Sequence, residues 1–267
     1  MKYRVGFCQY KPKLFAIDKN LSRLGEMLSG VEADLIVLPE LAISGYVINS
    51  KEELENVAEE VKKSKTIEMF RELSRKKKTS YVVGFAEKEG MKYYNSAFLI
   101  NPGGELSVYR KIHLFNREKQ IFSPGDTGFI VKQAKNDVKV GILICFDWIF
   151  PESARALTIQ GAEIICHPSN LVLPWCQQAM VTRSIENRVF TITANRVGTE
   201  KNGEVEMVFT GQSQVTNPYG EVLKRFDLVE EGVWVVKIDP EHARNKWVTD
   251  YNHIIEDRKP EFYKSLG

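Results

Sequence analysis

The sequence predicts a single α/β domain built on mixed β-sheet. Short runs rich in β-branched and aromatic residues alternate with helical runs along the 267 residues. Some of these strand-like runs are joined by short turns, as in hairpins, and others by a helix, as in parallel crossovers. No Ser-, Gly- or Pro-rich linker divides the chain, so we expect one domain over residues 1–267.

The chain opens with a strand, a helix and a second strand. Lys2–Tyr10 has the alternation of a strand, and Asp18–Ser29 that of a helix whose first amides Asp18 is expected to cap. Asp34–Leu38 is a continuous apolar run that ends at Pro39. Such a run is typical of a strand buried on both faces.

The middle of the chain predicts a long helix followed by three strands joined by turns. We expect the helix over Lys51–Lys78, where the basic end of the run suits the helix dipole. The three strands are expected at Tyr81–Glu87, Tyr93–Asn101 and Glu105–Arg110.

In the second half of the chain, strand-like and helical runs alternate again, and the last runs are strand-like. The expected elements are the strands Val138–Ile144, Glu163–Cys166 and Phe190–Asn195, the intervening helices Pro151–Gln160 and Gln177–Val189, and the late strands Gln212–Thr216, Glu221–Arg225 and Gly232–Ile238. Residues 251–267 are polar and aromatic with little core periodicity. We expect this tail to pack on a partner subunit.

Composition excludes several classes of function. The net charge of +2 provides no field that would attract a nucleic acid. No segment approaches the roughly 20 apolar residues of a membrane-spanning helix, and the N-terminus lacks the pattern of a signal peptide. We therefore expect a cytoplasmic protein with reduced thiols, since its scattered cysteines form no CxxC pair: Cys8, Cys145, Cys166 and Cys176.

Three strand ends are each followed by a reactive side chain. These are Glu40, Lys111 and Cys145. Each alone has an ordinary explanation: a charge at a helix start, a loop lysine, and a buried cysteine acting as a small apolar residue. Because α/β sheets place their sites at strand ends, the three together predict one site.

The sequences around these residues resemble the motifs of the nitrilase, or carbon-nitrogen hydrolase, superfamily. The three motifs are Val37–Glu40, Tyr109–Leu114 and Ile144–Trp148, in the family's order, and His167–Asn170, Arg183–Arg188 and Ala194–Arg196 resemble its secondary segments. The resemblance covers nearly the whole chain. It implies a four-layer α-β-β-α sandwich with mixed sheets, and a homodimer or higher homo-oligomer formed through the helices that follow the cysteine motif.

The resemblance implies Cys145 as nucleophile, Glu40 as base and Lys111 as the cation of the site. Glu118 matches a second glutamate that helps to hold the lysine and the substrate. The chemistry independently supports these roles, because a cysteine attacks as a thiolate and needs a nearby proton acceptor. A glutamate between apolar strands should have a raised pKa. Lys111 and the backbone amide of Phe146 would stabilise the oxyanion.

The substrate is expected to be a small neutral or amine-tailed molecule. Family members that act on carboxylate-bearing substrates commonly have an arginine three or four residues after the cysteine, where this chain has Trp148 and Ile149. An anion beside apolar groups would be costly, unless an arginine from elsewhere in the chain pairs with it. The expected pocket-lining residues are Tyr46, Trp148, Asn170 and Trp175.

Neither a metal nor an organic cofactor is expected. His113 and His167 would suggest a zinc site with Cys166, yet no HxxxH or CxxC spacing accompanies them. We expect His113 to satisfy backbone groups beside Lys111, and His167 to open a loop ahead of Pro168. Three functions remain open: an amidase or N-carbamoyl amide hydrolase, a nitrilase, and a non-catalytic or redox-sensing dimeric scaffold in which Cys145 is packed or oxidised.

Overall fold

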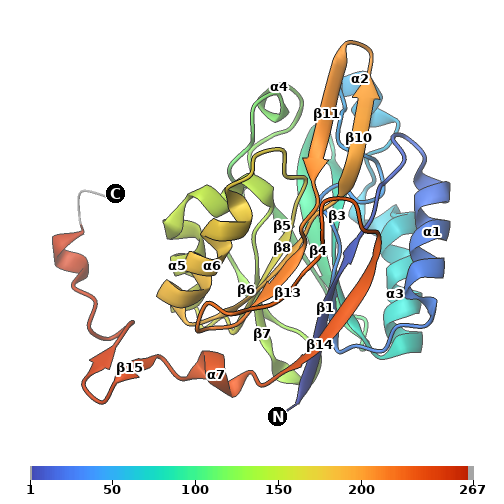
Figure 1. Ribbon diagram of the computed structural model, residues 1–267. Coiled ribbons are helices and arrows are strands. Elements are labelled where there is room, and N and C mark those ends of the chain that lie inside the picture. Colours follow the sequence, from blue (N-terminus) through green and yellow to red (C-terminus); the bar gives the residue numbers. More distant parts are fainter. Residues whose placement is uncertain (1, 264–267) are drawn as a thin grey trace.

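The computed structural model describes residues 2–263, in which two six-stranded mixed sheets pack face to face (Figure 1). Helices cover the two outer faces, so that the layers run α-β-β-α. The predicted four-layer sandwich is thereby confirmed.

The first sheet has the strand order β14-β1-β2-β3-β4-β5. Strands β1, β2 and β3 are parallel to one another, and the other pairs are antiparallel. The bounds are β1 Tyr3–Gln9, β2 Leu35–Val37, β3 Ser80–Glu89, β4 Lys92–Ile100, β5 Leu106–Arg110 and β14 Gly232–Ile238.

The second sheet has the order β13-β12-β9-β8-β7-β6, with β7, β8 and β9 parallel. Its strands are β6 Val131–Gln133, β7 Lys139–Ile142, β8 Ile164–Pro168, β9 Phe190–Ala194, β12 Gln214–Thr216 and β13 Val222–Arg225. In both sheets, the parallel strands lie in the middle, where both faces are covered.

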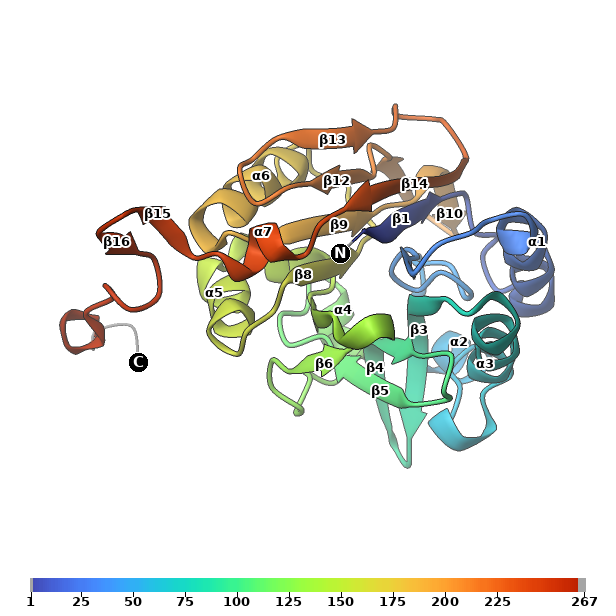
Figure 2. The same ribbon diagram turned by 90° about the horizontal axis from the view of Figure 1, so that it is seen from below.

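The two outer layers are pairs of helices, seen end-on in Figure 2. Helices α1 (Ile17–Ser29) and α3 (Lys65–Lys77) cover the first sheet, and α5 (Pro151–Ile159) and α6 (Cys176–Asn187) cover the second. The shorter helices are α2 Lys51–Glu55, α4 Glu118–Ile121 and α7 Glu241–Arg244, with the 3₁₀ turns η1 Val61–Lys63, η2 Lys135–Asp137, η3 Cys145–Ile149 and η4 Pro260–Phe262.

The main core lies between the sheets. Val5 and Phe7 of β1 belong to the same buried cluster as Ile142, Ile164 and Ile192 of the second sheet. Each such side chain contributes about 1.5–3 kcal/mol when fully buried. A second core lies between the first sheet and its helices. The central strands are thus held from both sides, which fixes the positions of their ends.

Two details of the predicted helices are wrong. Asp18 does not cap the first helix, because α1 starts at Ile17 after Ala16 and Asp18 lies within its first turn. The predicted helix over Lys51–Lys78 is three pieces, α2, η1 and α3. Ser50 and Ser64 each accept a hydrogen bond from an amide three residues on, and each begins a new helix.

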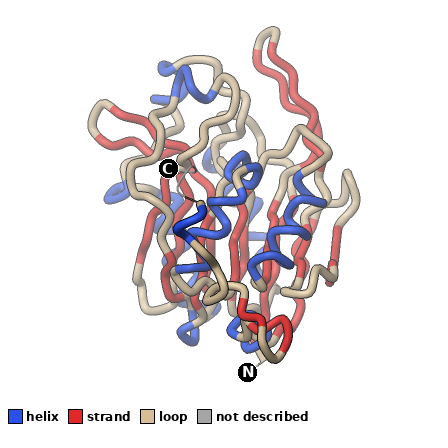
Figure 3. Tube along the Cα trace, turned by 90° about the vertical axis from the view of Figure 1, so that its left-hand side faces the viewer, coloured by secondary structure: helices blue, strands red, loops and turns tan. Residues whose placement is uncertain are grey.

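A hairpin that the sequence analysis did not predict projects from one end of the sandwich (Figures 1 and 3). It consists of β10 (Val197–Asn202) and β11 (Val205–Thr210). Toward the C-terminal end of the described residues, β15 (Trp247–Thr249) and β16 (Asn252–His253) lead into a segment that extends away from the sandwich (Figure 2).

The predicted tail has exposed aromatic side chains in its described part. Tyr251 is 88% exposed and Phe262 is 79% exposed. Residues 264–267 of the tail lie outside the described residues, and packing on a partner subunit stays a prediction. Among residues 2–263, no helix is both long and apolar enough to cross a membrane.

Candidate active site

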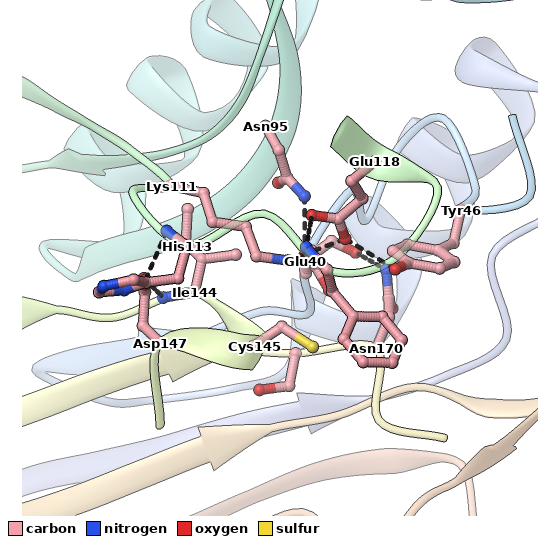
Figure 4. Close-up of polar contacts among 12 residues, drawn as sticks. Glu40, Tyr46, Asn95, Lys111, His113, Glu118, Ile144, Cys145, Asp147 and Asn170 are labelled. Atoms are coloured by element: carbon pink, nitrogen blue, oxygen red, sulfur yellow. Dashed lines mark hydrogen bonds and ion pairs between the residues drawn. The ribbon is translucent and has the colours of Figure 1, made fainter. Parts of the chain in front are cut away.

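The structure brings Glu40, Lys111 and Cys145 together from three separate strand ends (Figure 4). Glu40 follows β2, Lys111 follows β5 directly, and Cys145 begins η3 after β7. The first two strands belong to one sheet and the third to the other. The site therefore lies where the ends of the two sheets meet, with the Cys145 sulfur pointing toward the charged groups.

The Glu40 side chain is completely buried. Its Oε1 accepts hydrogen bonds from Lys111 Nζ at 2.6 Å and from Asn95 Nδ2 at 2.7 Å, while Oε2 has no partner among the described residues. Gly84 of β3 lets the strand approach closely, because a Cβ there would lie 2.5 Å from the Cα of Glu40. Burial raises the pKa of Glu40 although Lys111 lowers it.

Lys111 joins two carboxylates. Its buried ammonium donates to Glu40 Oε1 at 2.6 Å and to Glu118 Oε1 at 2.8 Å. Burial alone lowers the pKa of Lys111, but Glu118 and Glu40 outweigh it and raise the pKa above its ordinary value. Tyr46 donates its hydroxyl to the same Glu118 oxygen at 2.6 Å, and the Phe115 amide donates to the other at 3.0 Å. Lys111 is therefore a fixed cation.

The backbone at Cys145 is held in an uncommon conformation. Its φ of 41° lies in the left-handed region, which residues other than glycine seldom adopt. The buried Asp147 supports the turn by accepting hydrogen bonds from the Ile144 amide at 2.9 Å and from the Tyr109 hydroxyl at 2.8 Å. His167 Nε2 donates to the Cys145 carbonyl at 2.9 Å. These contacts fix Cys145 on a rigid turn.

The two histidines differ from their predicted surroundings. His113 was expected to satisfy backbone groups, but its Nδ1 bonds the Asp147 carboxylate at 2.8 Å. His167 was expected to open a loop, but it is a buried residue of β8. Burial lowers the pKa of His167 to about 4, so its ring is neutral near pH 7.

The surroundings of Cys145 favour its protonated thiol form. Burial and the negative charge of Glu40 raise the pKa of the thiol well above its usual range, although Lys111 and the backbone amide of Asn170 lower it. Glu40 Oε2, which has no partner among the described residues, leaves a hydrogen-bond acceptor free in the same site.

The space beside Cys145 is a cavity of about 20 Å³, large enough for a water molecule. Among the predicted pocket residues, Phe146, Trp148 and Asn170 line it; the remaining walls are Phe115 and Leu171 to Leu173. Tyr46 lines a second cavity of about 20 Å³, which shares Phe115 and also contacts Glu118. A larger cleft of about 670 Å³ beside α1 contains none of the predicted site residues.

Trp175 lies apart from both cavities. It precedes α6, is 60% exposed, and is not among the residues that line either cavity. Asn170, in contrast, connects two parts of the site, because its Nδ2 donates to the Glu40 carbonyl at 2.9 Å while its own amide contacts Cys145.

Sequence reasoning missed Asn95 and the supporting role of Asp147. Asn95 lies within β4, and only the pairing of β4 with β3 places it beside Glu40. Asp147 lies inside the cysteine motif, two residues after Cys145. A charged residue in this otherwise apolar segment was the signal that could have indicated its role. Within residues 2–263, no group of three or more His, Cys, Asp or Glu side chains is arranged to hold a metal ion.

Comparison with known proteins identifies the family of the chain. The carbon-nitrogen hydrolase family model matches residues 4–246. A protein named nitrilase from Pyrococcus abyssi is 42% identical over 263 residues, covering 97% of this chain and 98% of the relative. An N-carbamoylputrescine amidase from Arabidopsis thaliana is 32% identical, covering 88% of this chain and 84% of the relative.

Solved structures of similar proteins share the fold. A carbon-nitrogen hydrolase from Helicobacter pylori superimposes with a TM-score of 0.87 at 26% identity, covering 100% of this chain and 98% of the other. An amidase from Nesterenkonia gives a TM-score of 0.81 at 24% identity, covering 99% of this chain and 96% of the other, which shows a likeness of fold alone. The family model spans most of the chain, and the relatives match it nearly end to end. The protein is therefore a member of the carbon-nitrogen hydrolase family and an enzyme acting on carbon-nitrogen bonds.

Proposed function

We propose that the protein hydrolyses a non-peptide carbon-nitrogen bond in a small linear amide or N-carbamoyl amide, through a thioester on Cys145. The observation that carries this proposal is the buried ammonium of Lys111, which bonds Glu40 and Glu118 beside the thiol. This arrangement supplies a nucleophile, a proton acceptor and a cation, which acyl transfer requires.

In the first half-reaction, the Cys145 thiol transfers its proton to Glu40 as its sulfur attacks the carbonyl carbon. The carbonyl oxygen becomes an oxyanion, which Lys111 and the backbone amide of Phe146 stabilise. Glu40 then gives its proton to the leaving nitrogen. The carbon-nitrogen bond breaks, ammonia or an amine departs, and the acyl group remains on sulfur as a thioester.

In the second half-reaction, water takes the place of the departed amine. Glu40 accepts a proton from the water as its oxygen attacks the thioester carbon. The second tetrahedral intermediate collapses, the carbon-sulfur bond breaks, and the proton on Glu40 returns to Cys145. The acid is released, and the site regains its starting protonation without any cofactor.

The cavity beside Cys145 favours a small substrate that has no carboxylate near its reacting carbon. None of the described residues lining the Cys145 cavity is an arginine or lysine, and most are apolar. A carboxylate there would lose its hydration without gaining a partner. The similarity to N-carbamoylputrescine amidase, a name that specifies an amine-tailed substrate, agrees with this preference.

A nitrile is the second candidate substrate, because the Pyrococcus relative, at 42% identity, is named a nitrilase. The same thiol would add to the nitrile carbon, and hydrolysis would release the acid and ammonia. The non-catalytic alternative has less support, because Cys8, Cys166 and Cys176 are completely buried and unsuited to resolving an oxidised Cys145.

Ammonia release from a panel of small amides, N-carbamoyl amines and nitriles tests the proposal. We expect turnover of neutral or amine-tailed amides and little turnover of carboxylate-bearing analogues. Intact mass after rapid quench should show substrate acyl mass on the wild type and none on Cys145→Ala. Turnover of nitriles alone would select the second candidate, and a folded protein that neither acylates nor releases ammonia would refute both.

A further inference from the structure

A carboxylate outside the catalytic group holds the loop that carries Tyr46. Glu200 of the β10–β11 hairpin is only 6% exposed. Its Oε1 accepts hydrogen bonds from the backbone amides of Tyr46 and Val47, both at 2.7 Å. Two successive amides that point at one oxygen form a nest, a backbone arrangement that binds anions.

The loop is shaped to receive this carboxylate. Gly45 has a φ of 81°, and a Cβ there would lie 2.8 Å from Glu200 Oε2. A side chain at residue 45 would therefore push the carboxylate out of the nest. Asn202 of the same hairpin adds a further link by donating to the Val47 carbonyl at 3.0 Å.

The charge of Glu200 is balanced by a buried arginine. Arg196 Nη1 donates to Glu200 Oε2 at 2.9 Å, and the Arg196 side chain is completely buried. Its guanidinium lies 4.0 Å from the centroid of the Phe209 ring, and Phe209 meets the Tyr46 ring edge-on at 5.9 Å. The hairpin thus contacts both the backbone and the ring of Tyr46.

Tyr46 in turn bonds the site. Its hydroxyl and the Lys111 ammonium share Glu118 Oε1, at 2.6 Å and 2.8 Å. We propose that Glu200 is a positioning residue that, through Tyr46, orients Glu118 and Lys111 for the reaction. The inference rests on the proposed function, because a misplaced Lys111 would be detected as a loss of turnover. It adds Glu200 to the two carboxylates of the site, Glu40 and Glu118, although Glu200 itself touches no reacting atom.

A double-mutant cycle between Glu200 and Tyr46 tests this inference. Glu200→Gln would place an amide NH₂ against either Arg196 or the two backbone amides, which are all donors, so one of these contacts must break. Tyr46→Phe removes only the hydroxyl. We expect each change to lower kcat roughly 10-fold, the effect of one hydrogen bond to a charged group, with KM little changed.

The double variant should be no slower than Tyr46→Phe alone, because both changes break the same chain of contacts. Losses that multiply to roughly 100-fold would overturn the inference, since they would mean independent effects. Wild-type kcat in a folded Glu200→Gln protein would also overturn it. If that variant fails to fold, Glu200→Asp keeps the charge beside Arg196 but is too short to reach both amides, and the same cycle applies.

Two further arms separate this inference from the proposed function. Glu206→Gln changes an exposed carboxylate on the other strand of the hairpin and should leave kcat at the wild-type value. The cycle is also run on the rate at which iodoacetamide alkylates Cys145, which needs no substrate. If the wild type hydrolyses no amide, the proposed function fails, while non-additive alkylation rates would still support the role of Glu200 and additive ones would refute it.

Discussion

Glu40, Lys111 and Glu118 form a buried cluster with two negative charges and one positive charge. Burying an unbalanced charge is costly, and it is the reason that Cys145 remains a thiol despite its lysine neighbour. Moving the thiol proton onto Glu40 transfers one negative charge to the sulfur without changing the total. Under the proposed mechanism, the proton therefore moves from Cys145 to Glu40 during attack, and no ion pair forms beforehand.

Lys111→Ala should lower kcat at least 100- to 1000-fold, roughly the cost of losing one oxyanion donor. The variant also removes the cation that lowers the pKa of Glu40, so Glu40 should become harder to ionise. Steady-state ammonia release measures the loss, and far-ultraviolet circular dichroism checks that the fold is kept. Lys119→Ala, an exposed lysine in the same segment, is the matched control and should be unaffected. Near-normal turnover of Lys111→Ala would refute the assignment.

The pH dependence of kcat/KM should report Glu40. The base must be ionised, so activity is retained above its pKa and lost as the pH falls through it. Burial raises that pKa, so the midpoint of the acidic limb should lie above the ordinary value of 4.5. A pH profile over acidic and neutral buffers measures the limb. Glu40→Gln should abolish turnover at every pH; a variant that keeps both its activity and the acidic limb would assign the base elsewhere.

The three principal site residues could be predicted because each stands in a contiguous motif that follows a strand. Asn95 could not, because its contact with Glu40 depends on how β3 and β4 pair and on which face of the sheet residue 95 lies. The link from Glu200 to Tyr46 spans 154 residues and depends on backbone amides, which no side-chain pattern reveals. Contacts of this kind become visible only in the folded chain.

At the scale of elements, the turn at η3 depends on its neighbours in both sheets. Tyr109 of β5 contacts Asp147 within the turn, and His167 of β8 bonds the carbonyl of Cys145. A left-handed conformation at a non-glycine residue persists only where surrounding contacts hold it. The position of Cys145 therefore depends on the positions of β5 and β8.

His167→Gln should reduce the acid sensitivity of the fold. The pKa of His167 falls from 6.5 to about 4 on folding, so its neutral form stabilises the native state above pH 6.5. That contribution, about 3 kcal/mol, is lost as the pH falls from 6.5 to 4, because the unfolded chain takes up the proton first. Glutamine has a neutral amide that can donate to the Cys145 carbonyl at any pH.

Urea unfolding at pH 7 and at pH 4 measures this contribution. The wild type should lose more stability between the two pH values than His167→Gln, by about 3 kcal/mol. His253→Gln, which changes a histidine of the C-terminal segment, serves as the control and should lose as much as the wild type. Equal losses in wild type and His167→Gln would show that another group causes the acid sensitivity.

Most strands and helices could be predicted from the spacing of apolar residues, because buried strands and amphipathic helices each require a regular apolar pattern in the sequence. The break in the predicted helix over Lys51–Lys78 was missed although Ser50 and Ser64 both act as caps. The β10–β11 hairpin was also missed. In β11, side chains alternate in burial, but the residue types show this only weakly, because the exposed Val208 stands between two apolar residues. A capping serine or a short alternating run is a weaker signal than a long apolar one.

At the scale of the whole molecule, the sandwich leaves apolar side chains on its outer helices. Ile159 of α5 is 47% exposed and Ile185 of α6 is 50% exposed, on helices that lie side by side. The first sheet's helices carry no residue of this kind among the large apolar side chains that are exposed. The tail with Tyr251 and Phe262 extends from the same side of the molecule (Figure 2).

Ile185→Lys should therefore weaken the proposed homodimer. Apolar side chains on one outer layer favour burial against a second copy, and a lysine there would have to be desolvated on association. Light scattering after size exclusion should give about twice 30.6 kDa for the wild type and a lower mass for the variant at equal concentration. Val229→Lys replaces a side chain that is 77% exposed in the loop between β13 and β14, and should leave the mass unchanged. A wild type that elutes as a monomer would contradict the dimer, whereas a dimer unaffected by Ile185→Lys would place the interface away from α6.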